Sequence, residues 1–167
     1  MTEPLWLSVA RAFEGLTEIP GPASNPVIMR WAADLHAPYT NDDEAWCALW
    51  LNRLCLACQL PRSGTGYALI RARSFEMWGR GIIEPALGAV CVFTRPGGGH
   101  VGLYLGERGD AYYVLGGNTA NKVGATWIAK GRLTAMRWPF EVSYNMAYAP
   151  KPFILSDAGT PVSTDEA

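Results

Sequence analysis

The sequence predicts an α+β domain in which N-terminal helices pack on a C-terminal antiparallel β-sheet. Two observations lead to this prediction. Up to about residue 79 the apolar residues recur at the spacing of a helix, and from residue 89 onward they lie in short extended runs separated by glycine-rich turns. Helices that precede the strands, instead of alternating with them, are typical of segregated layers.

Four helices are expected in the first half of the chain. The first has apolar residues at helical spacing, and the second follows Asn25-Pro26, a capping residue and a proline suited to the first turn. The third follows an acidic run in which Asn41 and Glu44 have the spacing of a capping box. The expected ranges are 5–13, 26–36, 45–60 and, after a glycine-bearing loop at 63–66, a fourth helix that ends near residue 79.

Five short strands are expected in the second half of the chain. Glycine-containing segments at 96–99 and 106–110 separate the first three, which is typical of an antiparallel meander. The expected strands are 89–94, 100–105, 111–115, 123–128 and 133–138.

The chain of 167 residues is long enough for one domain with a substantial core. From residue 150 onward the sequence turns polar and rich in Pro, Ser, Thr and Asp. We therefore expect a single domain over 1–149 and a flexible tail over 150–167.

The charge of the chain is almost balanced, with 14 Lys and Arg against 15 Asp and Glu, and a net charge of -1. Without a basic run, neither nucleic acid nor an anionic membrane surface is an expected partner. No apolar run approaches the roughly 20 residues that span a bilayer, and no secretion signal is evident. We expect synthesis in the cytoplasm without a signal peptide and no membrane insertion.

Cys47 is the candidate nucleophile among four cysteines, all of which are expected to be reduced thiols. It falls within the first two turns of the third expected helix, where the positive end of the helix dipole favours the thiolate. The neighbouring acidic residues oppose this effect, so a base or cation from elsewhere must assist. The alternative is that Cys47 is one more small buried residue, like Cys55 or Cys58.

His100 is the candidate base, because it follows three glycines and opens an expected strand, where its side chain can face a cleft. Asn118 ends the next strand, and its amide could orient the imidazole. Asn121 is the competitor for that role and a candidate for substrate binding. The alternatives are a turn-capping histidine and an asparagine selected for its backbone conformation. His36, near the end of the second helix, is expected to be structural.

Trp46 either forms a wall of a substrate groove or packs in the core. Cys55-x2-Cys58 lies within a helix and lacks the second pair of ligands that a metal site needs. The glycines at 97–99 lead into a strand and lack a following Lys-Ser/Thr, so phosphate binding is not expected. We expect no metal and no cofactor.

Four short motifs occur in a characteristic order between about Pro4 and Pro139. They are Trp46-Cys47-Ala48 after the acidic run, Pro85-x2-Gly88 before an extended run, Gly99-His100-Val101-Gly102, and Leu115-Gly116-Gly117-Asn118. In this order and spacing the chain resembles the CHAP-like and NlpC-like papain-fold cysteine peptidases of cell walls. It is most similar to the small phage-type branch of peptidoglycan hydrolases.

The resemblance implies a papain-like (CHAP-type) fold and a cysteine hydrolase that acts on peptidoglycan stem peptides as an amidase or endopeptidase. Cys47 matches the nucleophile of the family, His100 the base, and Asn118 the residue that orients the base. Asn41, six residues before the nucleophile, matches an oxyanion donor, although a Gln is usual there.

Two further positions depart from the family pattern. Many relatives carry a Glu two residues before the late Asn, where this chain has Gly116, and Asp42 or Asp43 is the alternative carboxylate. The usual Gly-Asp before the core strand is Gly88-Ala89 here.

The resemblance also implies a place of action, which is the cell wall (periplasm) or a phage-like particle. The leading hypothesis is a murein hydrolase of a phage or prophage, either an endolysin delivered with a holin or a virion tail component. The protein is expected to be a monomer. One alternative is an interbacterial murein amidase effector with an immunity protein as partner. The other is a non-catalytic cell-wall-binding or structural tail module.

Overall fold

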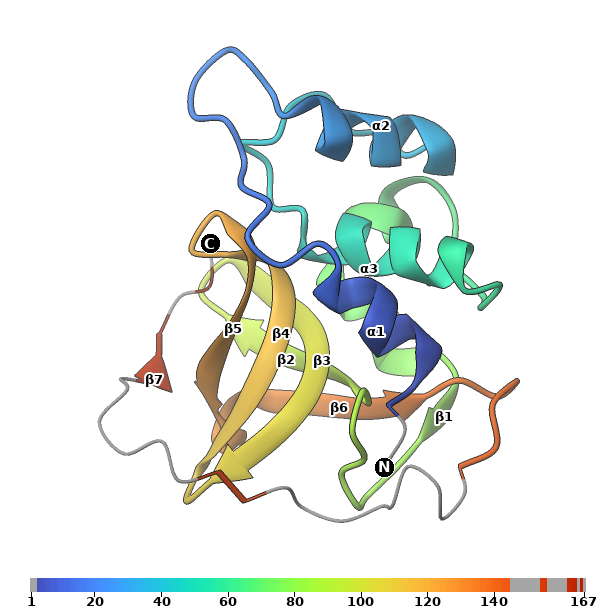
Figure 1. The fold of residues 1–167 in the computed structure, drawn as a ribbon, viewed down its shortest axis with the longest axis vertical. Coiled ribbons are helices and arrows are strands. Elements are labelled where there is room, and N and C mark those ends of the chain that lie inside the picture. Colours follow the sequence, from blue (N-terminus) through green and yellow to red (C-terminus); the bar gives the residue numbers. More distant parts are fainter. Residues whose placement is uncertain (1–2, 145–153, 156–161, 165, 167) are drawn as a thin grey trace.

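The computed structural model describes residues 3–144, 154–155, 162–164 and 166. The helical layer comes first in the chain and the sheet second, so the predicted α+β class is confirmed (Figure 1). The elements in chain order are α1 (Leu5–Arg11), α2 (Pro26–Leu35), α3 (Cys47–Ala57), the 3-10 helices η1 (Gly66–Ile70) and η2 (Ala72–Met77), β1 (Arg80–Gly81), β2 (Val90–Arg95), β3 (Gly98–Arg108), β4 (Ala111–Thr119), β5 (Lys122–Ala129), the 3-10 helix η3 (Lys130–Arg132), β6 (Leu133–Trp138) and β7 (Val162–Ser163).

The helix α3 is the centre of the helical layer, because it contacts α1, α2, η1 and the strands β3 and β4. Eight of its 11 residues are buried. The helix α2 begins as predicted, with the Asn25 side chain accepting a hydrogen bond from the backbone N–H of Val27 at 2.8 Å. Its last turn is closed by His36 in the left-handed conformation, which fits the structural role expected for this residue.

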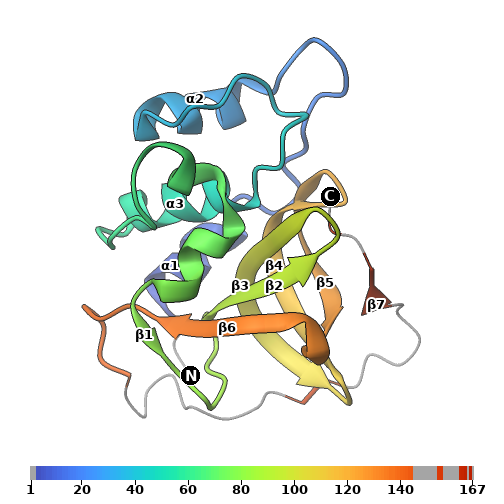
Figure 2. The same cartoon turned by 180° about the vertical axis from the view of Figure 1, so that it is seen from behind.

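Two helix predictions need correction. The third helix begins at Cys47 and not at residue 45, and the predicted capping box is absent, because the Asn41 side chain accepts from the N–H of Asp43 in its own turn. The fourth helix is replaced by η1 and η2, which are separated by the extended residue Arg71. Figure 2 shows these two short helices in front of α3 and above β1 and β6.

The five predicted strands are confirmed as β2 to β6, and two short strands join them in one sheet with the order β1-β6-β2-β3-β4-β5-β7. All pairs are antiparallel except β5 with β7. β6 follows β5 in the chain but pairs with β2, on the far side of β3 and β4.

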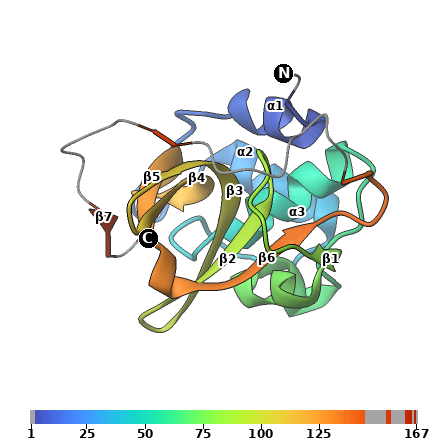
Figure 3. The ribbon, with the colours of Figure 1, turned by 90° about the horizontal axis from the view of Figure 1, so that it is seen from below.

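The connection from β5 to β6 forces the sheet to curl. A flat sheet would hold these strands four spacings apart, which is about 19 Å, whereas the three residues of η3 reach at most about 14 Å. The sheet therefore closes partly on itself, as Figure 3 shows. In this arrangement Arg132 in η3 reaches back to β2, and its Nε donates to the carbonyl of Thr94 at 2.9 Å.

The described residues of the C-terminal segment lie against the sheet. Val162 and Ser163 pair with β5 as β7, and Leu155 donates its N–H to the carbonyl of Glu107 at 2.8 Å. These described residues contact the sheet, and the flexible tail expected over 150–167 stays a prediction. The rest of that range lies outside the described residues.

Candidate functional site

Cys47 is the first residue of α3 and lies against the strand β3. Its side chain is 4% exposed, and the backbone N–H of Val101 is placed to donate to the sulfur. The thiol lines a pocket of about 340 Å³ between the start of α3, the junction of η1 and η2, and the β2–β3 turn. The predicted nucleophile is thus at a helix start and beside a cavity.

The environment of Cys47 favours the neutral thiol. Burial raises the pKa of Cys47, whereas the Val101 N–H, the positive charge of Arg95 and the backbone N–H groups of Ala48 and Cys47 lower it by less. A thiol with a raised pKa is protonated at neutral pH. A nucleophilic role therefore requires a base that removes the proton during the reaction.

His100 lies on β3, one residue before the contact between Cys47 and Val101, and is 2% exposed. Its direction follows from strand alternation. At Gly99 a Cβ atom would point to η2, 3.0 Å from Cγ of Arg73, so His100 points to the other face of the sheet. There its Nε2 atom lies 2.7 Å from the position that a Cβ of Gly116 would occupy.

The structure does not bring the predicted pair together: Cys47 lines the pocket on the η2 side of β3, whereas His100 points to the other face and is not among the described residues that line this pocket. Nε2 of His100 is buried and has no hydrogen-bond partner within the described part of the chain. Burial lowers the pKa of His100 to about 4; Glu166 acts in the opposite direction, and Arg95 and Arg132 add to the decrease. The imidazole is thus neutral at pH 7 and has an unused nitrogen.

Asn118 lies on β4, the strand next to β3, as predicted. The register of β4 with β5 shifts between Gly116 and Thr119, and Asn118 has a positive φ of 55° in this irregularity. Its Oδ1 atom is buried without a hydrogen-bond partner, so among the described residues its amide does not contact His100 through a hydrogen bond. Its role as the orienting residue stays a prediction.

Gly116 cannot be replaced by the Glu that many relatives carry without movement of His100. A Cβ at this position would lie 2.7 Å from Nε2 of His100 and 3.1 Å from Oγ1 of Thr119. The departure from the family pattern at residue 116 therefore has a steric reason, because the imidazole occupies the space of the side chain.

Asn121 lies in the two-residue turn between β4 and β5. Ala120 and Asn121 both have positive φ, 48° and 63°, as a type I′ turn requires. Asn121 is exposed, and its carbonyl accepts from the N–H of Glu18 at 3.0 Å. The turn explains its presence, and substrate binding by Asn121 stays a prediction.

Among the predicted supporting residues, Asp42 has a structural role, whereas the Asp43 side chain has no hydrogen bond or ion pair with a described residue. Oδ2 of Asp42 accepts from the N–H groups of Ile19 at 3.0 Å and Asn25 at 2.6 Å, and the residue is fully buried. Asp43 is exposed. The Asn41 side chain bonds within its own loop and is not among the residues that line the Cys47 pocket, so an oxyanion role would require it to move.

Trp46 requires a correction, because its predicted role in substrate binding needs an exposed ring. The residue is 0% exposed, its Nε1 donates to Oε2 of Glu18 at 3.1 Å, and its ring lies 6.3 Å from that of Trp31. The alternative of core packing is the one observed.

Residue 117 has room only for a glycine, because a Cβ there would meet the Cβ and Cγ of Trp50 and the ring of Trp46.

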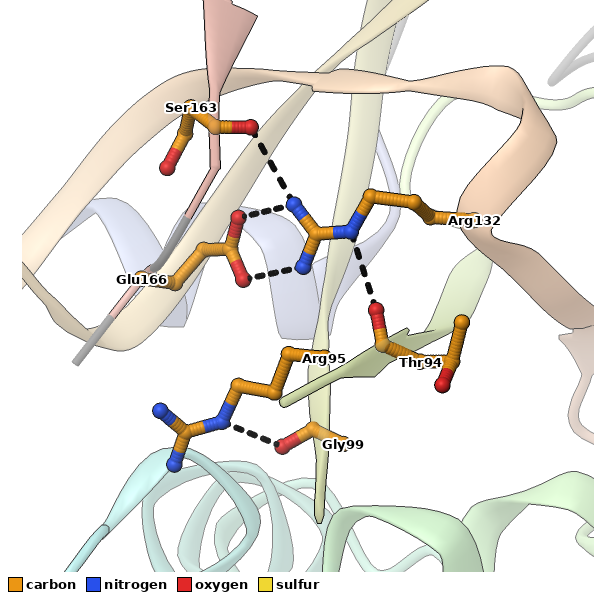
Figure 4. Close-up of polar contacts among 6 residues, drawn as sticks. All are labelled: Thr94, Arg95, Gly99, Arg132, Ser163 and Glu166. Carbon is orange, nitrogen blue, oxygen red and sulfur yellow. Dashed lines mark hydrogen bonds and ion pairs between the residues drawn. The ribbon is translucent and has the colours of Figure 1, made fainter. Parts of the chain in front are cut away.

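Glu166 is a residue near His100 that sequence reasoning missed. Its carboxylate is 1% exposed and accepts two hydrogen bonds of 2.7 Å from Arg132, which also donates to the carbonyl of Ser163 (Figure 4). Its charge acts on His100. A single Glu in a polar segment has no periodicity or motif, so the sequence contains no signal for this placement.

No protein-family model matches this chain, and no curated protein matches it. Within the described residues, none of the helices has the length and apolar character needed to cross a membrane. The described part of the chain also contains no group of three or more His, Cys, Asp and Glu side chains arranged to hold a metal ion.

Proposed function

We propose that this protein is a papain-type cysteine hydrolase that cleaves an amide bond in peptidoglycan stem peptides. The observation that carries the proposal is the position of Cys47 at the start of α3, beside a cavity and in contact with the strand residue that follows His100. The motif order that resembles the CHAP-like peptidases supplies the substrate class. Cys47 is the nucleophile, His100 the base and Asn118 the orienting residue of this proposal.

The reaction proceeds in two steps. His100 removes the proton of Cys47, the sulfur attacks the carbonyl carbon, and His100 returns the proton to the leaving amine as the C–N bond breaks. Water then attacks the thioester, which releases the carboxylic acid and restores the thiol. In this proposal the backbone N–H of Cys47 stabilises the oxyanion, a contribution of about 3 kcal/mol for one such donor.

The proposed mechanism requires a contact between the thiol and the imidazole. Catalytic hydrogen bonds are often long or absent before substrate binds and form in the complex. The imidazole points to the face of β3 away from the Cys47 pocket, so this contact requires the His100 side chain to turn toward the thiol. Among the described residues, no hydrogen bond holds Nε2 in its present position. The low pKa of the imidazole keeps it neutral but also makes it a weak base, so proton transfer from Cys47 requires this pKa to rise when substrate binds.

A second candidate function is a non-catalytic cell-wall-binding or structural module of a phage-like particle. It is favoured by one specific observation, the raised pKa of Cys47 without a hydrogen bond to His100 among the described residues. A thiol in this state is not activated. An interbacterial effector would use the same chemistry as the leading proposal and differ in its partner, an immunity protein.

The test is digestion of purified Gram-negative-type and Gram-positive-type sacculi, with the products identified by mass spectrometry. The proteins compared are the wild type, Cys47→Ala and the control Cys55→Ala, which removes a buried thiol on the same helix. We expect new amine and carboxyl termini with wild type and Cys55→Ala but not with Cys47→Ala. Folded wild-type protein that binds sacculi without cleaving them would contradict the hydrolase and support the module.

A further inference from the structure

Three arginines line the pocket that contains the Cys47 thiol. They are Arg71, Arg73 and Arg95, and no acidic side chain is among the described residues that line it. For a chain with a net charge of -1, this is a local concentration of positive charge. Among the described residues that line the pocket, Cys47 is the one with a nucleophilic side chain.

The arginines come from two walls of the pocket. Arg71 and Arg73 belong to the η1–η2 side, and Arg95 is the last residue of β2, where its Nε donates to the carbonyl of Gly99 at 3.2 Å (Figure 4). The charge of Arg95 acts on the Cys47 thiol. A ligand that enters the pocket therefore meets arginines from both elements.

The three arginines differ in how far their charge is already compensated. Arg73 forms an ion pair with Glu76 at 2.9 Å. Arg71 lies over the ring of Tyr67, with its guanidinium carbon 5.6 Å from the ring centroid, and no carboxylate of a described residue lies within ion-pair distance of it. Arg71 is thus the group whose charge is most available to a ligand.

The floor of the pocket leaves room for a ligand. At Gly97 and Gly98 no atom lies within 4 Å of the position of a Cβ, so the turn presents its backbone to open space. Guanidinium groups bind carboxylates with paired hydrogen bonds, and neutral ligands do not gain from this arrangement.

We propose that the pocket binds a carboxylate next to the bond that Cys47 attacks, so that the preferred substrate is a peptide with a free carboxylate beside its scissile amide. The identity of that peptide as a murein stem peptide rests on the proposed function. The preference for an anionic ligand at Cys47 is independent of the proposed function, because it follows from the three arginines alone. Stem peptides with free carboxylates are then cleaved in preference to the same peptides with amidated carboxylates.

The test uses two alkylating reagents of similar size, iodoacetate and iodoacetamide, with modification of each cysteine followed by peptide mapping. The measured quantity is the ratio of the iodoacetate rate to the iodoacetamide rate at Cys47, compared with the same ratio at the partly exposed Cys58. A change in the thiolate fraction affects both reagents equally and cancels in this ratio.

We expect the ratio at Cys47 to exceed that at Cys58 and to fall in Arg71→Gln, by about threefold, the order of magnitude for loss of one unit charge near the thiol in water. Arg73→Gln lowers it less, because Glu76 already compensates Arg73, and Glu76→Gln raises it. Arg71→Lys retains most of the preference. Arg30→Gln, on the exposed side of α2, is the matched control and leaves the ratio unchanged. High salt reduces the preference of the wild type.

Two results would overturn the proposal. One is an equal ratio of rates at Cys47 and Cys58. The other is an unchanged ratio at Cys47 in the triple variant Arg71→Gln/Arg73→Gln/Arg95→Gln. A Cys47 that neither reagent modifies while Cys58 reacts would also overturn it, because the pocket then admits no ligand to the thiol. Since alkylation needs no hydrolysis, these outcomes are independent of the sacculus digestion. A preference for iodoacetate without murein cleavage would retain the anion pocket and reject only the proposed function.

Discussion

Glu166 and Arg132 form a bidentate ion pair, with both nitrogen–oxygen distances at 2.7 Å, that fixes the C-terminal segment to the connection between β5 and β6. The Glu166 side chain is fully buried and that of Arg132 is 19% exposed. The same guanidinium also holds β2 through Thr94. One arginine therefore ties together three parts of the chain that are distant in sequence.

Removal of Arg132 alone should destabilise the fold strongly, because it leaves a buried carboxylate without its partner. We expect Arg132→Met to lower the free energy of unfolding by about 3 kcal/mol. The double variant Arg132→Met/Glu166→Met removes both charges and should recover most of this loss. Urea unfolding of the three proteins measures both effects. A double variant no more stable than Arg132→Met would show that the carboxylate is not the cause.

The buried His100 should make the protein sensitive to mild acid. Its pKa is about 4 in the folded state and 6.5 in an exposed histidine, so the unfolded chain binds a proton that the folded protein excludes. Stability is therefore retained above pH 6.5 and decreases as the pH falls from 6.5 to 4, by about 3 kcal/mol in total.

Unfolding measured between pH 4 and 7 tests this expectation. His100→Gln should remove this part of the pH dependence, whereas His36→Asn, at an exposed position with the left-handed conformation that Asn tolerates, should retain it. Glu166 contributes separately. Burial raises the pKa of Glu166, but its hydrogen bonds and ion pair with Arg132 outweigh burial and hold it below 4.5, so its contribution is lost only at lower pH.

Gly116 and Gly124 face each other in the pairing of β4 with β5 and offer a matched comparison. Gly116→Ala places a Cβ against the ring of His100 and should cost about 1–3 kcal/mol through displacement of the imidazole. At Gly124 the nearest atom to a Cβ is the flexible end of Lys122 at 3.4 Å, so Gly124→Ala should fold normally. Thermal unfolding measures both. Equal effects would show that the space around His100 is not restrictive.

Asp42 and Asp43 are adjacent and chemically identical, but only Asp42 holds backbone groups. We expect Asp42→Ala to lower the free energy of unfolding by about 3 kcal/mol, because two N–H groups lose a charged acceptor. Asp43→Ala should stay within about 0.5 kcal/mol of the wild type. Denaturant unfolding of the pair decides this, and a large effect at Asp43 would indicate that it, and not Asp42, supports the loop before α3.

The sequence predicts helices and strands correctly where the local spacing of apolar residues determines the structure. The five strands of the sheet were predicted because apolar runs alternate with glycine-rich turns, and α2 because Asn25 and a proline mark its start. The start of α3 was placed too early, because the acidic run looks like a cap while Asn41 closes its own turn. A single helix is expected between the loop at 63–66 and about residue 79, but the extended residue Arg71 divides this segment into two short 3-10 helices.

The sequence identifies the candidate site residues, but it does not determine how their side chains are arranged. Cys47 and His100 come from local motifs, but the face to which His100 points depends on the pairing of β3 with β2 and β4, which no local pattern specifies. The placement of Glu166 depends on a contact with Arg132, 34 positions earlier, and a single residue in a polar segment gives no indication of such a contact.

The short η3 connection also determines the order in which the sheet can form. The pairs of β2 to β5 join strands that are neighbours in sequence, whereas β6 must pair with β2 across a separation of 40 residues between Phe93 and Leu133. Loop closure of this length is slow for a free chain but rapid once the hairpins of β2 to β5 have brought β5 near β2. We therefore expect the pairing of β6 to be a late step of folding, and its amide hydrogens to exchange before those of β3 and β4 when the native protein opens.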